Sequence, residues 1–91
     1  MTLKIRLNSQ IFMPNINKKI HEALKKTFNK SKIKNNIDSL KIGDLKQWDS
    51  LGNFNLLLEV EKIFNCRIDT KSFNKIKSVK DIKKFLKNSG T

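Results

Sequence analysis

The sequence predicts an all-α protein: a small bundle of three main helices plus one short helix, with a long loop between the first and second helices. Three segments place apolar residues three and four positions apart, which is the spacing of one helix face. Only residues 1–13 alternate apolar and charged residues, and no second strand-like segment exists to pair with them. A chain of 91 residues has room for one domain with a single modest core.

The first helix is expected to begin at Pro14 and Asn15, because proline suits a helix boundary and asparagine caps well. Its apolar stripe comprises Ile16, Ile20, Ala23, Leu24, Thr27 and Phe28. Residues 29–47 show no sustained period, and a connection of this length suggests a functional or well-packed loop. We interpret residues 1–13 as an N-terminal extension ahead of a domain over residues 14–91.

The second helix, expected over residues 50–65, has two apolar faces. Its core stripe comprises Leu56, Leu57, Val60, Ile63 and Phe64. Leu51, Phe54 and Leu58 fall on the opposite side of the helix. Such a helix is either central in its bundle or presents one face to a partner. We expect the short helix and the long loop to cover this second face only in part, and the rest to face a partner.

The third and fourth helices follow a short polar stretch. One turn of helix is expected over residues 72–75. The last helix is expected to begin at Ser78, whose hydroxyl can cap it, with Asp81 three residues later in a capping-box-like arrangement. Its stripe comprises Val79, Ile82, Phe85 and Leu86, and residues 88–90 end it.

The net charge of +12 invites a nucleic-acid interpretation. However, only Arg6 and Arg67 are arginines, whereas base and phosphate recognition favours the arginine fork. Lysine, asparagine and isoleucine are all abundant, as codon bias in an AT-rich genome would produce, and we favour that explanation. The basic excess is also uneven, because residues 44–69 hold five acidic residues against three basic ones.

The chain offers few groups for catalysis or metal binding. Cys66 is the only cysteine, so no intramolecular disulfide can form, and one thiol with one histidine cannot build a zinc site. His21 lies in a lysine-rich stretch and is expected to be a surface residue. No nucleophile elbow or glycine-rich phosphate loop is present. We expect no enzyme activity, no metal, no membrane span, a monomer and a cytoplasmic location.

Ser50 is the candidate functional residue. It is expected at the start of the second helix, where the backbone holds it in place and the helix N-terminus favours an attached phosphate. The alternative is that Asp49 and Ser50 merely cap the helix, and the dipeptide alone favours this alternative.

The wider pattern resembles the signature of acyl carrier proteins and the related peptidyl carriers. The residues that carry the resemblance are Trp48, Asp49, Ser50, Leu51, Gly52, Leu56, Leu57, Leu58, Glu59, Glu61, Ile63 and Phe64, followed by Ile68, Ile76, Val79, Ile82 and Phe85. With the first helix and the long loop included, it covers about residues 14–88.

The resemblance implies that Ser50 receives 4′-phosphopantetheine from coenzyme A and that Asp49 helps to present it to the phosphopantetheinyl transferase. It also implies that Leu51, Phe54, Leu58 and Glu61 lie on the face that partner enzymes read. The function would be to carry an acyl or aminoacyl group as a thioester between enzymes that load and transfer it, in a fatty-acid-like or specialised biosynthetic pathway.

The chain departs from the family in charge. Typical carriers are strongly acidic, whereas this chain is basic, and Asn55 and Lys62 stand where an acidic residue is common. Dedicated partners, with acidic docking faces as one option, are therefore expected. Two alternatives stay open: a degenerate carrier fold that serves as an interaction module, and a basic nucleic-acid-binding helical domain.

Overall fold

The computed structural model describes residues 15–89, so Pro14 and the predicted extension over residues 1–13 lie outside the described residues. The helices are α2 (Ile16–Thr27), α3 (Ser50–Phe64), α4 (Thr70–Lys75) and α5 (Val79–Ser89). Between residues 15 and 89 the only β pairing is a single bridge between Lys41 and Ser78. The predicted all-α bundle of three main helices and one short helix is confirmed.

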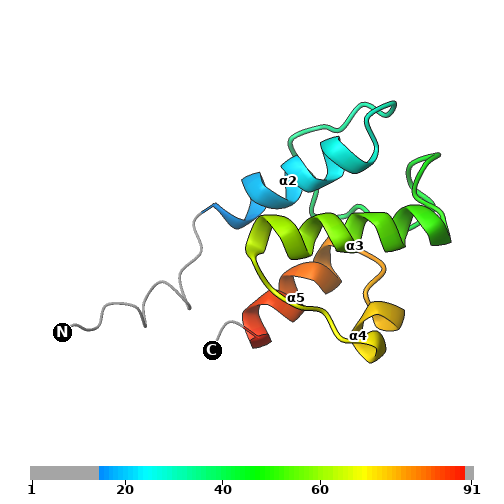
Figure 1. Cartoon of the computed structure of the whole chain (residues 1–91). Coiled ribbons are helices and arrows are strands. Elements are labelled where there is room, and N and C mark those ends of the chain that lie inside the picture. Colours follow the sequence, from blue (N-terminus) through cyan, green and yellow to red (C-terminus); the bar gives the residue numbers. More distant parts are fainter. Residues whose placement is uncertain (1–14, 90–91) are drawn as a thin grey trace.

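Helix α3 runs through the middle of the bundle. In Figure 1, α2 lies on one side of it, and α4 and α5 lie on the other. The three predicted core stripes meet in one cluster, because each helix turns its apolar side inward. The buried hydrophobic residues are Ile20, Ala23, Leu24, Phe28, Ile37, Trp48, Leu56, Leu57, Val60, Ile68, Ile76, Val79, Ile82 and Leu86. No described helix is long and apolar enough to cross a membrane.

The long loop between α2 and α3 is held at three places. Trp48 is fully buried and stacks on Phe28, with the ring centroids 5.4 Å apart. The backbone N–H of Ile42 donates to the carbonyl of Lys77 at 2.8 Å. The carbonyl of Leu40 accepts from the N–H of Val79 at 3.0 Å. These bonds attach the loop to the connection between α4 and α5, so the loop is the well-packed kind that its length suggested.

Helix caps explain where the chain departs from the predicted boundaries. Asn15 occupies the predicted N-cap position of α2, but its side chain makes no capping hydrogen bond. Helix α4 begins at Thr70 rather than residue 72, because Asp69 caps it. The Ser72 hydroxyl donates to that carboxylate at 2.6 Å, which lowers the pKa of Asp69. Helix α3 ends at Phe64 because Asn65 adopts a left-handed conformation.

The start of α5 follows the predicted cap in part. The Ser78 hydroxyl accepts from the N–H of Asp81 at 3.0 Å, as predicted. The Asp81 carboxylate, however, accepts from the N–H of Lys77 at 3.0 Å, not from that of Ser78. The N–H of Lys77 is thus bound to α5 while its carbonyl binds the long loop.

Close backbone packing fixes the loop against the first turn of α3. A Cβ atom on Gly52 would lie 2.0 Å from the carbonyl oxygen of Gln47 and 3.0 Å from Cε1 of Phe28. The Gln47 carbonyl belongs to the backbone and cannot rotate away as a flexible side chain would. Only glycine allows α3 and the loop to approach this closely.

Gly52→Ala is expected to lower the free energy of unfolding by about 2 kcal/mol, because overpacking outweighs the gain in helix propensity. Urea unfolding measures the change. Asn55→Ala, at an exposed position of the same helix, is the control and should change it by less than about 0.5 kcal/mol. A stability of Gly52→Ala equal to that of the control would contradict the close contact.

Candidate functional site

Ser50 is the first residue of α3, and its side chain is exposed. The capping role falls to the residue before it: the Asp49 carboxylate accepts from the N–H of Gly52 at 2.8 Å. The Ser50 hydroxyl makes no hydrogen bond within residues 15–89. The two interpretations of the Asp49–Ser50 dipeptide, a helix cap and an exposed functional hydroxyl, therefore apply to different residues. Asp49 is the cap, and Ser50 presents a hydroxyl at the positive end of the helix.

A buried amide supports the turn that carries Ser50. Asn53 is only 7% exposed, and both ends of its amide are bound. Its Oδ1 accepts from Nε1 of Trp48 at 2.9 Å, and its Nδ2 donates to the carbonyl of Ile76 at 2.8 Å. Asn53 was not predicted from the sequence to be part of the site. Its place in the sequence could have indicated this role, because Asn53 is a polar residue three positions before Leu56, on the side of the helix that faces the core.

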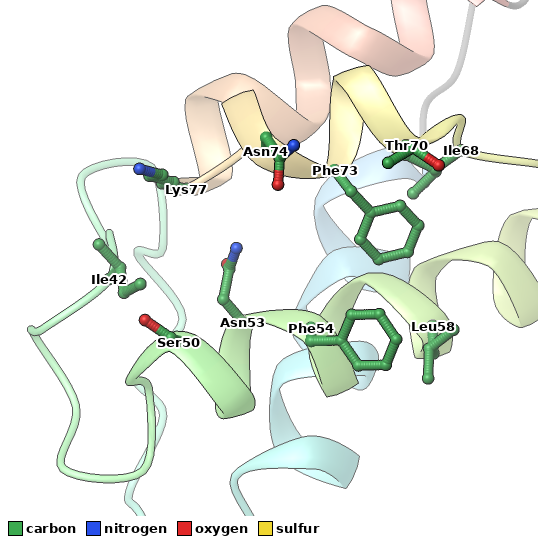
Figure 2. Close-up of a pocket in the computed structure, with 10 residues that line it drawn as sticks. All are labelled: Ile42, Ser50, Asn53, Phe54, Leu58, Ile68, Thr70, Phe73, Asn74 and Lys77. Atoms are coloured by element: carbon green, nitrogen blue, oxygen red, sulfur yellow. The ribbon is translucent and has the colours of Figure 1, made fainter.

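A pocket of about 610 Å³ opens between the first half of α3 and α4. Figure 2 shows Phe54 and Leu58 of α3 facing Phe73 of α4, with Ser50 at the N-terminal end of α3. The rings of Phe54 and Phe73 lie 5.3 Å apart and are tilted by 40°. The residues that line the pocket are Ile42, Ser50, Asn53, Phe54, Leu58, Ile68, Thr70, Phe73, Asn74 and Lys77.

The second apolar face of α3 is largely uncovered. Leu51 is 68% exposed, Phe54 50% and Leu58 38%, and we call these three residues the exposed apolar face. Phe73 of α4 covers part of it through its contact with Phe54. Two of the three, Phe54 and Leu58, line the same pocket as Ser50, while Leu51 does not. The expected partial cover by the short helix is thus confirmed.

The two acidic residues predicted for partner binding both have internal partners. Asp49 caps α3, as described above. Glu61 is half-buried, and its carboxylate accepts from the N–H of Ile68 at 2.7 Å, which holds the chain after α3. Glu61 lies about three turns beyond Ser50 and does not line the pocket. The structure therefore brings Phe54 and Leu58 to Ser50 but gives Glu61 a structural contact.

Neither remaining candidate side chain belongs to the site. His21 is half-buried rather than on the surface, and its Nε2 lies 3.3 Å from the carbonyl oxygen of Ile33 in the long loop. Cys66 is half-buried, and burial and the nearby Glu61 carboxylate raise the pKa of its thiol. Among residues 15–89, no three His, Cys, Asp or Glu side chains come together to hold a metal ion.

Asn53→Ala is expected to lower the free energy of unfolding by about 2–4 kcal/mol, because the Trp48 indole N–H and the Ile76 carbonyl lose their partner in the interior. Asn55→Ala removes the same amide from an exposed position of the same helix and serves as the control. Urea unfolding followed by Trp48 fluorescence measures both. Equal stability of the two variants would show that the buried amide is dispensable.

Alkylation of Cys66 should be slow near neutral pH and should accelerate only above the pH at which an ordinary thiol ionises. Its raised pKa keeps the reactive thiolate scarce in the folded protein. Iodoacetamide labelling against pH, followed by mass, measures the rate. Urea-unfolded protein is the control and should show the ordinary profile. Coincident profiles for folded and unfolded protein would contradict the effect of burial.

No family model, no curated protein and no solved structure matches this chain. The resemblance to carrier proteins therefore rests on the residues of the chain, above all on Asp49, Ser50 and Leu51 at the start of α3. The site consists of an exposed hydroxyl at the start of a helix, beside an apolar face and a pocket.

Proposed function

We propose that the protein is a carrier whose Ser50 hydroxyl bears a 4′-phosphopantetheine group, and that the thiol of this group holds an acyl or aminoacyl cargo as a thioester. The observation that carries the proposal is the division of roles at the start of α3. Asp49 caps the helix, and the adjacent Ser50 hydroxyl is exposed and uncommitted within the described residues.

The chemistry of attachment suits this placement. The Ser50 oxygen forms a bond to the phosphorus next to the pantetheine arm, and the phosphoanhydride bond of coenzyme A breaks. Adenosine 3′,5′-bisphosphate leaves, and the hydroxyl proton passes to a base of the transferase. The product is a phosphodiester at the N-terminus of α3, where the free N–H groups and the helix dipole stabilise negative charge.

Rigidity is the contribution of this chain. A transferase and the enzymes that load and unload the cargo must each find the same serine in the same position. The Asp49 cap, the close packing of Gly52 and the bonds of Asn53 hold the turn that carries Ser50. In this proposal the chain performs no catalysis, and the bond-making groups belong to its partner enzymes.

A second candidate function is an interaction module that uses the same fold without an attached group. The exposed apolar face favours it, because a binding surface of this kind needs no cofactor. The two functions differ only in whether Ser50 is modified.

Incubation with coenzyme A, Mg²⁺ and a broad-specificity phosphopantetheinyl transferase is expected to add the mass of one phosphopantetheine group to the protein. Intact-mass measurement detects it. Ser50→Ala should gain no mass, because it lacks the accepting hydroxyl. Ser39→Ala, at an exposed serine of the long loop, is the matched control and should be modified like the unaltered protein. Failure of several transferases on folded protein would favour the interaction module.

A further inference from the structure

Most acidic side chains of this protein have a partner within the protein, although Asp38, Asp44, Asp49 and Asp69 remain exposed. Within residues 15–89, seven of the eight acidic residues, all but Glu22, have a hydrogen-bond or ion-pair partner. Three accept backbone N–H groups at the starts of helices, and Glu61 accepts one after α3. The bound carboxylates are Asp38, Asp44, Asp49, Glu59, Glu61, Asp69 and Asp81.

The lysines show the opposite distribution. Within residues 15–89, only Lys26, Lys41, Lys62 and Lys83 make ion pairs, and the pairs of Lys26 and Lys62 with Glu59 are long, at 3.8 and 3.9 Å. Exposed pairs of this kind contribute little free energy and are easily exchanged for other partners. Because the net charge is +12, the outward field of the protein is positive.

Two lysines flank the exposed apolar face. Lys77 lines the pocket at the end near Ser50, as Figure 2 shows. Its position is held by two backbone bonds, to Asp81 and to Ile42. Lys62 lies one turn after Leu58 on the same side of α3, with its side chain 76% exposed. The face thus has an apolar centre with a cation near each end.

The shape of this face favours a protein over a lipid surface. Phe54, Leu58 and Phe73 border a pocket, so this part of the face is hollowed, while Leu51 lies outside the pocket. A hollow of this kind accepts a protruding apolar side chain of a partner, the usual centre of a protein interface. Insertion into a bilayer requires the apolar side chains to project together into the lipid.

We infer that the exposed apolar face docks an acidic protein surface, in which one protruding apolar side chain enters the pocket and flanking carboxylates pair with Lys77 and Lys62. The inference deepens the proposed function, on which it rests for the identity of the partners as loading and transferring enzymes. The positive field would also steer such partners to the protein, an effect that weakens as salt increases.

Two synthetic helical peptides test the inference. Both carry one exposed Leu–Phe pair, flanked by Glu in one peptide and by Lys in the other. The Ser50→Ala variant is titrated with each, and backbone amide shifts are followed by NMR. The acidic peptide is expected to bind about tenfold more tightly or better, with shifts at α3 and α4. Because this variant cannot be modified, the result is independent of phosphopantetheine attachment.

Surface variants locate the contact. Phe54→Ala is expected to weaken binding of the acidic peptide about tenfold, because it removes an apolar contact at the centre. Lys77→Glu should weaken it about fivefold by reversing a flanking charge. Lys25→Glu makes the same charge change at an exposed position of α2 and is the matched control, with an expected effect below about twofold.

Three results would overturn the inference. The first is equal or tighter binding of the basic peptide, or no shifts with the acidic one. The second is a set of shifts confined to α2 and α5, which would mark a general attraction to lysine. The third is sedimentation with phosphatidylcholine–phosphatidylglycerol vesicles that Phe54→Ala abolishes, which would assign the face to a membrane. Modification of Ser50 in the other experiment would leave the carrier proposal standing in each case.

Discussion

The side-chain amide of Asn53 is the contact on which the arrangement of this protein depends. It joins the end of the long loop at Trp48 to the connection before α5 at Ile76, through the first turn of α3. A buried amide is costly unless all of its polar atoms are bound, so it favours one arrangement of these three segments over others. Ser50 sits on the same turn, and its position is fixed as a consequence.

Neighbouring residues at this turn point their side chains in opposite directions. Trp48, Gly52 and Asn53 face inward and fit closely, whereas Ser50 and Leu51 face outward. Asp49 lies between the two groups and supplies the cap. This division allows a rigid helix start to present an exposed hydroxyl, because no outward residue is needed to hold the turn together.

Charge separates this chain from typical acyl carrier proteins, the family whose function we propose for it. Those proteins are acidic, and basic surfaces of their partner enzymes bind their carboxylates. Here the two carboxylates that the resemblance would assign to recognition bind N–H groups of the chain itself. The apolar residues of α3 keep the exposure that recognition requires, and Lys77 and Lys62 flank them. A partner adapted to this surface needs the opposite charge to that of a typical carrier partner.

The three longer helices were predictable from the amino-acid sequence, because the apolar spacing in α2, α3 and α5 reports directly which side of each helix is buried. The same spacing identified Leu51, Phe54 and Leu58 as a second face, and the capping residues located Ser50 at a helix start. The roles of Asn53, Glu61 and His21 depend on contacts between distant segments of the folded chain. Their partners are Trp48, Ile76, Ile68 and Ile33. Such bonds join segments whose proximity depends on how the whole bundle packs, and no local pattern records it.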